Sequence, residues 1–175
     1  MICAQAGADG GAVWAAEITV SVVTDSTFYS ASATGGDGGA IYATSGSLSV
    51  VGCDIEECSA RNKGVAIFHE AVTGTAEIIN TRIVRNVAMK SRALVFLSAL
   101  KSVLIDGIEV SENDNKGAGL IVLSKLQKTT IANSTFERNM VRVMRVYQLY
   151  TGDFLAGARE ITTTRPRTRR WTAPA

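Results

Sequence analysis

The chain has 175 residues, of which 46% are hydrophobic, and it carries a formal net charge of +2. This length and apolar content fit one domain with a continuous core, and they exclude a disordered chain. The longest apolar stretch, residues 93–100, is far shorter than the ~20 residues of a membrane-spanning helix, so we predict no membrane span in this chain.

Residues 1–10 contain no basic region followed by an apolar run, so we predict no signal peptide. We expect residues 1–9 to form the N-terminal edge of the domain. Cys3, Cys53 and Cys58 lack the spacing of metal ligands. The single histidine, His69, is expected at the surface of a strand end. Cys53 and Cys58 allow a disulfide or two buried free thiols. We favour the thiols, because neighbouring strand and turn positions seldom present suitable Cβ vectors.

A repeat of about 27 residues runs through segment 10–150. Its clearest mark is a ladder of large, β-favouring apolar residues at spacings of 27, 28, 27 and 26, namely Phe28, Ile55, Ile83, Val110 and Phe136. Three positions before each of them stands a residue type that tolerates a left-handed backbone, namely Asp25, Gly52, Asn80, Gly107 and Asn133. One tight turn is therefore predicted in every repeat.

Two further strands are predicted around this turn and ladder. Apolar and polar residues alternate before the turn, as at Leu48 and Val50, and an apolar run such as 65–68 closes the repeat. Stretches such as 47–52 and 129–136 are together rich in Val, Ile, Thr, Ser and Gly, which disfavours helical repeats, while leucine-rich repeats are shorter and propeller blades longer. The sequence therefore predicts an all-β, right-handed parallel β-helix, a solenoid of about five coils with three short strands per coil.

Asparagines stand three residues after the apolar ladder in the last three repeats, at Asn86, Asn113 and Asn139. We predict an internal ladder in which their amides bond to one another and to the turn backbone. Asn133 begins an Asn-Ser-Thr sequon at a turn, so it is a possible glycosylation site if the chain enters a eukaryotic secretory pathway.

Aromatic residues recur at one position of the closing strand, at Trp14, Tyr42 and Phe68. They fit a stripe for sugar stacking or an internal stack, and we favour the stack. Asp9 and Asp37 each precede paired glycines, as in calcium-binding turns, but the nonapeptide calcium repeat needs Gly and Asp at further positions. We expect these aspartates to serve the turns, and we predict no cofactor, with calcium as the one candidate.

The repeat decays at its C-terminal end. Residues 162–164 are threonines where an apolar ladder residue is expected, and Ile161 is a poor substitute. Residues 141–147 fit the closing strand of the fifth coil or a short capping helix, and we favour the strand slightly. Residues 141–175 carry a net charge of +5 and the rest of the chain −3. Segment 151–175 is predicted to be a basic, disordered tail, and nucleic-acid binding is not expected without interleaved aromatic residues.

The motifs 38–41 (Gly-Gly-Ala-Ile) and 136–139 (Phe-Glu-Arg-Asn), with a variant of the first at 10–13, resemble the Gly-Gly-Ala-Ile and Phe-x-x-Asn repeats of polymorphic outer-membrane-protein autotransporter passengers. More broadly, segment 10–141 is similar to the pectate-lyase-like β-helix superfamily. Each motif has one strict copy, and the middle repeats lack the Phe. The resemblance implies an extracellular or cell-surface location and a role in adhesion or surface display. The missing signal segment and the start just before a coil suggest a partial chain.

The nearest candidate for catalysis is a set of charges on consecutive repeats, Asp54 and Glu56 with Arg82 and Arg85. A polysaccharide lyase or hydrolase needs outward carboxylates beside a basic group, to neutralise the substrate and to move a proton. Alternating charges on an exposed face are usually only solvated, and Glu56 and Arg85 are placed to form an ion pair across coils.

The leading functional hypothesis is therefore a non-enzymatic structural or adhesive segment of a larger surface or secreted protein, which binds a protein or a glycan. The alternative is a fragment of a carbohydrate-active β-helix enzyme. A carboxylate cluster in a groove with a basic neighbour would favour the enzyme, and uniformly mixed outward charge would favour the binding segment. A third hypothesis is a truncated chain without independent function, which the loss of the repeat and the basic tail suggest.

Overall fold

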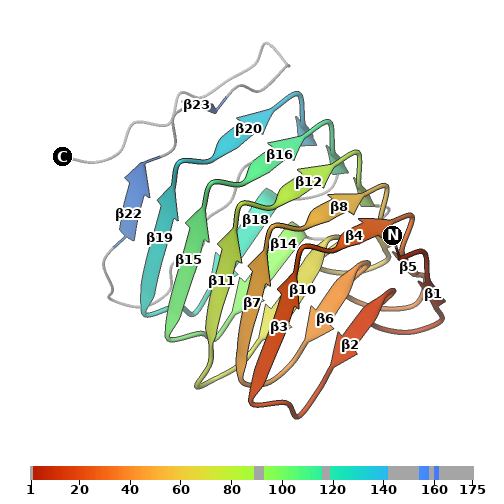
Figure 1. Cartoon of the computed structure of the whole chain (residues 1–175), viewed down its shortest axis with the longest axis horizontal. Helices are drawn as coiled ribbons and strands as arrows, with labels where there is room; N and C mark the ends of the chain where they lie inside the picture. Colours follow the sequence, from red (N-terminus) through yellow and green to blue (C-terminus); the bar gives the residue numbers. More distant parts are fainter. Residues whose placement is uncertain (1, 89–92, 116–118, 142–153, 158–159, 162–175) are drawn as a thin grey trace.

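The chain winds into a β-solenoid of about five turns, in which every pair of neighbouring strands is parallel (Figure 1). The computed structural model describes residues 2–88, 93–115, 119–141, 154–157 and 160–161. The predicted all-β, parallel solenoid with a period of about 27 residues is confirmed. No helix occurs in these described segments, so none of them contains a helix that could span a membrane.

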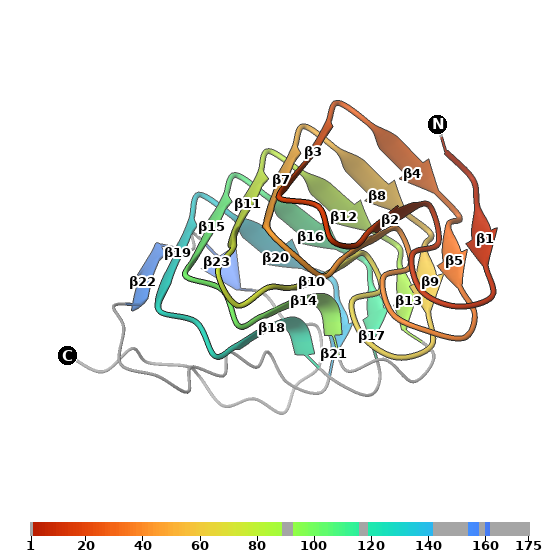
Figure 2. The same cartoon turned by 90° about the horizontal axis from the view of Figure 1, so that it is seen from below.

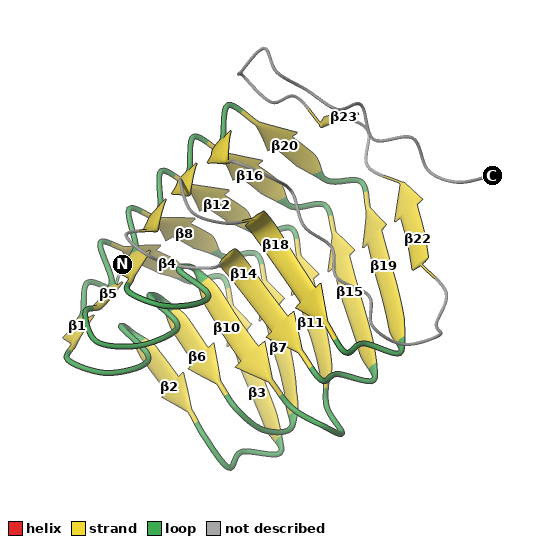
Figure 3. Ribbon diagram, turned by 180° about the vertical axis from the view of Figure 1, so that it is seen from behind, coloured by secondary structure: helices red, strands yellow, loops and turns green. Residues whose placement is uncertain are grey.

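Four sheets run along the solenoid. Sheet C contains β2 (Val13–Ala15), β6 (Ile41–Ala43), β10 (Ile67–Glu70), β14 (Ala93–Ser98) and β18 (Gly119–Ser124) (Figure 3). Sheet D contains β3 (Val20–Thr24), β7 (Ser47–Val51), β11 (Thr75–Ile79), β15 (Ser102–Asp106), β19 (Lys128–Ala132) and β22 (Phe154–Gly157). Sheet A contains β4 (Thr27–Tyr29), β8 (Asp54–Glu56), β12 (Arg82–Val84), β16 (Glu109–Ser111), β20 (Thr135–Glu137) and β23 (Glu160–Ile161).

Sheet B is an addition to the three strands per coil that the sequence predicts. It contains β1 (Gln5–Ala6), β5 (Ser32–Ala33), β9 (Ser59–Ala60), β13 (Val87–Ala88), β17 (Asp114–Asn115) and β21 (Met140–Val141). Figure 2 shows these short strands following one another along the solenoid. Two residues are too few to produce a visible alternation of apolar and polar side chains, which is why the sequence pattern misses this strand.

The predicted apolar ladder is confirmed, and its residues belong to the core. Its members pair in register on sheet A and are at most 1% exposed, namely Phe28, Ile55, Ile83, Val110 and Phe136. Ile161 pairs with Phe136 in the same register, so it continues the backbone ladder into the segment that was expected to be a tail. Stacked coils thus bury in common the apolar side chains that one coil alone would expose.

The number of residues between successive strands is the same in every coil from sheet D through sheet A to sheet B, and it varies around sheet C. In every complete coil the inward residue of sheet D precedes the ladder residue of sheet A by seven positions, as Leu48 precedes Ile55, and sheet B follows four positions later, as at Ser59. The repeat length varies from 26 to 28 residues because the segments that enter and leave sheet C differ in length.

The predicted tight turn between sheets D and A is confirmed. All five of its residues have a left-handed backbone with φ between +47° and +64°, namely Asp25, Gly52, Asn80, Gly107 and Asn133. Asx residues and glycines alternate here for a steric reason. A Cβ atom on Gly52 would lie 2.5 Å from Oδ1 of Asp25, and one on Gly107 would lie 2.5 Å from Oδ1 of Asn80. Each Asx side chain thus occupies the space that a side chain in the next coil would need.

The predicted asparagine ladder is confirmed at the corner between sheets A and B. The side-chain amide of Asn86 donates to Oδ1 of Asn113 at 3.0 Å, and that of Asn113 donates to Oδ1 of Asn139 at 2.9 Å. In the preceding coil the backbone N–H of Cys58 donates to Oδ1 of Asn86 at 2.8 Å. All these residues are buried, so the backbone groups around them cannot form hydrogen bonds to water. The asparagine side chains supply hydrogen-bond partners for these groups instead.

Cys53 and Cys58 are buried free thiols, as the sequence analysis favoured. Burial raises the pKa of the Cys58 thiol to about 12. The surface position expected for His69 is wrong, because this residue is fully buried. In β10 it lies in register with Ala43 and Leu97, which both belong to the core, and its Nδ1 atom lies 3.2 Å from the Ala43 carbonyl oxygen.

The ends of the solenoid add strands to segments for which no β structure was expected. β1 lies within the predicted edge 1–9 and pairs with β5. β22 and β23 lie within segment 151–175 and pair with β19 and β20. The closing strand or capping helix expected over 141–147 falls, apart from its first residue, outside the described residues.

Candidate functional site

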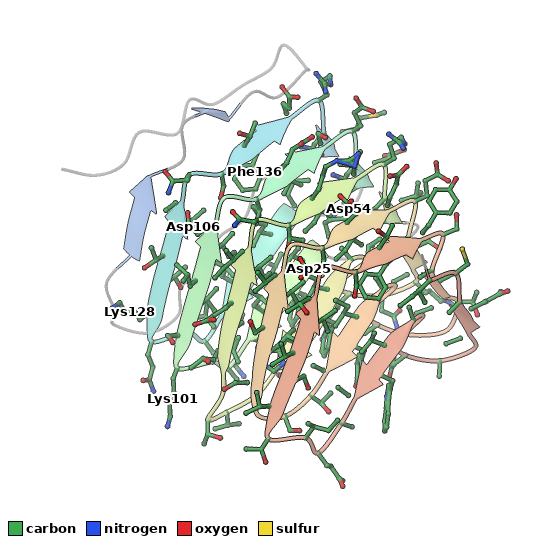
Figure 4. The ribbon with its side chains drawn as sticks, in the orientation of Figure 1. Asp25, Asp54, Lys101, Asp106, Lys128 and Phe136 are labelled. Atoms are coloured by element: carbon green, nitrogen blue, oxygen red, sulfur yellow. The ribbon has the colours of Figure 1, made fainter. Side chains whose placement is uncertain are left out.

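Three of the four catalytic candidates, Asp54, Glu56 and Arg82, lie on strands of sheet A, where Figure 4 labels Asp54, and the fourth, Arg85, directly follows β12. Arg82 pairs in register with Asp54, and Glu56 pairs with the residue two positions after Arg82. The side chains of Asp54, Arg82 and Arg85 are 49%, 40% and 45% exposed, whereas that of Glu56 is 17% exposed. The sequence analysis therefore identified a true spatial cluster, which we call the charged cluster.

Ion pairs connect the members of the charged cluster. Arg82 Nη1 lies 3.7 Å from Asp54 Oδ1 and 3.8 Å from Glu56 Oε2. Arg85 is hydrogen-bonded to Glu56, as expected, and its Nε atom lies 3.7 Å from Oε1 of Glu57. The carboxylates are thus balanced by neighbouring guanidinium groups at the surface, where such pairs contribute at most about 1 kcal/mol each.

A second left-handed column follows sheet A, and the sequence analysis missed it. Its residues have φ between +51° and +56° and none of them is glycine, namely Ser30, Glu57, Arg85, Glu112 and Arg138. From Glu57 onward the charge alternates from coil to coil, and Arg138 Nε lies 3.2 Å from Oε1 of Glu112. A glycine or asparagine would have signalled this turn, but charged residues in the same conformation leave no such pattern.

An aromatic column runs along the outward side of sheet C and consists of Trp14, Tyr42, Phe68 and Phe96, which pair in register. Successive side chains of a strand point to opposite faces of the sheet. Ile41, the residue before Tyr42, is buried in the core, so the column lies on the outward side. The rings of Tyr42 and Phe68 stack at 5.0 Å between centroids, and those of Phe68 and Phe96 stack at 5.4 Å. The predicted stacking of Tyr42 and Phe68 is confirmed, and Phe96 extends it. The internal position that the sequence analysis favoured is wrong, because the stack lies on the outward side of sheet C and its rings do not belong to the core cluster. Trp14 is 62% exposed.

Acidic turn residues flank the first two coils of this column. The Oδ1 atom of Asp9 accepts the backbone N–H of Asp37 at 2.7 Å, and Oδ1 of Asp37 accepts that of Lys63 at 2.8 Å. These aspartates therefore serve turns, as expected. Burial raises the pKa of Tyr42, and the charges of Asp9 and Asp37 raise it further. Burial likewise raises the pKa of Asp37, against the effect of Lys63 and with added repulsion from Asp9 and Glu70.

A cation replaces the carboxylate in the third coil. Lys63 stands at the position of Asp9 and Asp37, and its Nζ atom lies 4.8 Å from the ring centroid of Phe96 and 5.7 Å from that of Phe68. These distances are those of cation–π interactions. The column therefore carries its own ammonium group at one end and carboxylates at the other.

The other expected sites have the following surroundings. Asn133 is exposed at its turn, and its side-chain amide donates to Oδ1 of Asp106 at 2.9 Å. The next residue of the sequon, Ser134, is buried and donates to the Ala132 carbonyl oxygen. Across the described residues, no group of three or more His, Cys, Asp or Glu side chains is arranged to hold a metal ion.

Comparisons with known proteins add no family. No protein-family model, curated protein or solved structure matches this chain. The resemblance to autotransporter passengers and to pectate-lyase-like proteins therefore rests on the sequence motifs and on the solenoid fold, and a shared solenoid fold does not specify an activity.

Proposed function

We propose that this chain is a non-enzymatic structural and adhesive segment of a larger surface or secreted protein, which binds a glycan or a protein through the outward side of sheet C. The observation that carries the proposal is the aromatic column on the outward side of sheet C, in which Trp14 is 62% exposed and Tyr42 lies beside the acidic turn residues Asp9 and Asp37. Tryptophan is among the residues most enriched in binding hot spots, because it offers a large rigid apolar surface with a polar edge.

The rigidity of the scaffold supports the same proposal. Trp14 and Tyr42 stand on paired parallel strands, and the backbone of their coils is held by the Asp9 and Asp37 hydrogen bonds. A preorganised site loses little conformational entropy when a ligand binds, so modest contacts suffice for affinity. The motif resemblance supports the extracellular or cell-surface location that forms part of this proposal.

The test is a screen of the purified chain and its Trp14→Ala variant on a glycan array, with and without calcium, together with an assay for released reducing or unsaturated sugar ends. We expect binding without turnover, and at least about a tenfold loss of affinity in the variant. Binding that Trp14→Ala leaves unchanged would remove the aromatic column from the site.

Turnover in the same assay would overturn the non-enzymatic proposal in favour of the carbohydrate-active alternative. Asp54→Asn and Glu56→Gln would then be the variants to examine, because these carboxylates lie beside Arg82. As matters stand, the pairing of the charged cluster's carboxylates with Arg82 and Arg85 favours a surface network over an acid–base pair.

A further inference from the structure

We propose that the corner between sheets C and D in the third coil is an acid-operated hinge, in which residues 71–74 move away from the solenoid when the buried imidazole of His69 takes up a proton. The corner follows β10 and ends at Thr75, the first residue of β11. The inference goes beyond the proposed function, because it concerns a movement of the scaffold and needs no ligand.

The chain is longer in this corner than in the corresponding corners of the other described coils. It advances by seven positions from His69, the inward residue of sheet C, to Ala76, the inward residue of sheet D. The second coil needs five positions and the first, fourth and fifth need six, namely Ala43 to Leu48, Ala15 to Ser21, Leu97 to Val103 and Leu123 to Thr129. The third corner therefore has chain to spare, and Val72 within it is 81% exposed although it is apolar.

The inside of this corner lacks the apolar filling of the next two corners. Those two are filled by fully buried leucines, namely Leu97 and Leu100 in the fourth coil and Leu123 and Leu126 in the fifth. The third coil carries His69 in register with Leu97, and residues 71–74 bury only Ala71 and Gly74. A segment with few buried apolar contacts opens more easily than its neighbours, so this corner is the weakly held one.

His69 is the group through which acid acts on the corner. Its Nδ1 atom lies 3.2 Å from the Ala43 carbonyl oxygen, and its Nε2 atom has no hydrogen-bond partner among the described residues. A proton on Nε2 would place a charge in the core without a partner, which is costly unless water reaches it. Burial accordingly lowers the pKa of His69, and backbone groups of Ala43, Thr75 and Gly46 counteract this only in part.

No charged side chain of the described residues offsets such a proton. The inward residues packed around His69 are apolar, namely Ala43 in β6, Leu97 in β14, and Ala76 and Ile78 in β11. Glu70, the next residue of β10, lies on the outward side, where its charge acts on Tyr42. Opening of the corner is therefore the way in which the protonated ring gains hydration.

Amide hydrogen exchange of the whole chain, resolved by NMR and corrected for the intrinsic rate at each pH, tests the hinge. The reporters are the backbone N–H groups of Ala71 and Lys101, which donate to the carbonyl oxygens of Ser98 and Gly74 at 3.2 and 2.9 Å. We expect their protection to fall between about pH 8 and about pH 5 by at least about threefold and by up to about thirtyfold. The upper value is that of a histidine with a pKa of 6.5 when the corner is open and no proton when it is closed.

The matched control is the N–H group of Ala99, which makes the equivalent hydrogen bond in the next corner, to the Ser124 carbonyl oxygen at 2.9 Å. At pH 5 it should stay better protected than that of Ala71. Low concentrations of urea should leave the exchange of Ala71 unchanged, because a local opening exposes little new surface. Exchange of Ala71 that matches Ala99 in protection and rises with urea would mean global unfolding and would overturn the hinge.

His69→Leu should abolish the pH dependence at Ala71, because it gives the third coil the residue that the fourth and fifth coils carry in register. His69→Gln, whose amide stays neutral, makes the same test if the leucine variant does not fold. A loss of protection that persists in these variants, or no loss in the wild type, would overturn the role of His69. The proposed function is tested separately on the glycan array, so the two can fail independently.

Discussion

One oxygen atom of Asn113 accepts two hydrogen bonds from Asn86, from its backbone N–H at 2.9 Å and from its side-chain amide at 3.0 Å. The amide nitrogen of Asn113 in turn donates to Oδ1 of Asn139 and to the carbonyl oxygens of Ile83 and Ser111. Asn113 is therefore the central link of a buried polar chain that connects three coils.

Asn113→Ala should lower the free energy of unfolding by about 3 kcal/mol, because it leaves two buried donors of Asn86 without their acceptor. Urea denaturation measures this value. The matched control is Asn62→Ala, which removes an exposed asparagine whose amide donates to the Gly35 carbonyl oxygen at 3.4 Å, and it should change stability by less than about 0.5 kcal/mol. Equal effects of the two substitutions would show that the ladder adds nothing specific.

Gly52→Ala should destabilise the chain by roughly 1–3 kcal/mol, because alanine at φ +64° is strained and its Cβ atom meets Oδ1 of Asp25. The steric part of this loss depends on Asp25. In an Asp25→Gly background the same substitution should therefore cost less, and a double-mutant cycle of unfolding free energies measures the difference. Strict additivity would contradict the steric account of the Asx–glycine alternation.

His69 should make stability depend on pH. Burial lowers its pKa below the ordinary value of 6.5, so the unfolded chain binds a proton more readily than the folded one. The free energy of unfolding should therefore fall as the pH drops from 6.5 towards the folded-state pKa. Chemical denaturation of wild type and His69→Leu between about pH 8 and about pH 5 tests this, and the variant should show a flatter profile. Parallel profiles would assign the pH dependence to other groups.

The Glu56–Arg85 contact should matter little for stability. The Glu56 side chain is only 17% exposed, but that of Arg85 is 45% exposed, so solvent screens the contact, and solvent-screened pairs typically contribute no more than about 1 kcal/mol. Wild type, Glu56→Gln, Arg85→Met and the double variant form a double-mutant cycle. Thermal or urea unfolding of the four proteins gives the coupling energy between the two side chains. A coupling energy well above about 1 kcal/mol would show that the charged cluster is a structural element in its own right.

Thiol reactivity should separate the three cysteines. Cys3 is exposed, whereas Cys53 and Cys58 are buried and burial raises the pKa of both. Native protein at about pH 8 should therefore react with a thiol reagent rapidly at Cys3 alone, and denatured protein at all three positions. Mass spectrometry of the labelled peptides distinguishes the outcomes. Rapid native labelling of Cys58 would indicate that its corner opens readily.

The sequence predicted those parts of the fold that repeat with a chemical signature. The apolar ladder and the Asx or glycine turn each recur five times, and the asparagine ladder recurs three times. Their residue types have few other uses, so their spacing was enough to predict the period of the repeat and the register of its strands. Sheet B was missed because its strands have two residues. The second left-handed column, which includes Arg85, was missed because a charged residue in a sequence does not indicate a left-handed backbone.

The candidate site was predictable in part. The neighbours of Asp54 and Arg82 followed from their places in the repeat, because side chains at equivalent positions lie one strand apart. The inward position of His69 required the register of β10 with its neighbours, since a histidine fits both the surface and the core. The cation–π contact of Lys63 depends on how a long flexible side chain folds back, which spacing along the chain does not reveal.

The constant spacing from sheet D through sheet A to sheet B has a consequence for how such a chain can change over evolution. A residue inserted within that arc would shift every following side chain out of its ladder, whereas the segments on either side of sheet C already differ by one or two residues between coils. New loops can therefore be grafted beside the aromatic column without disturbing the register of the solenoid. The face proposed here for ligand binding is also the face on which this architecture leaves the most room for diversification.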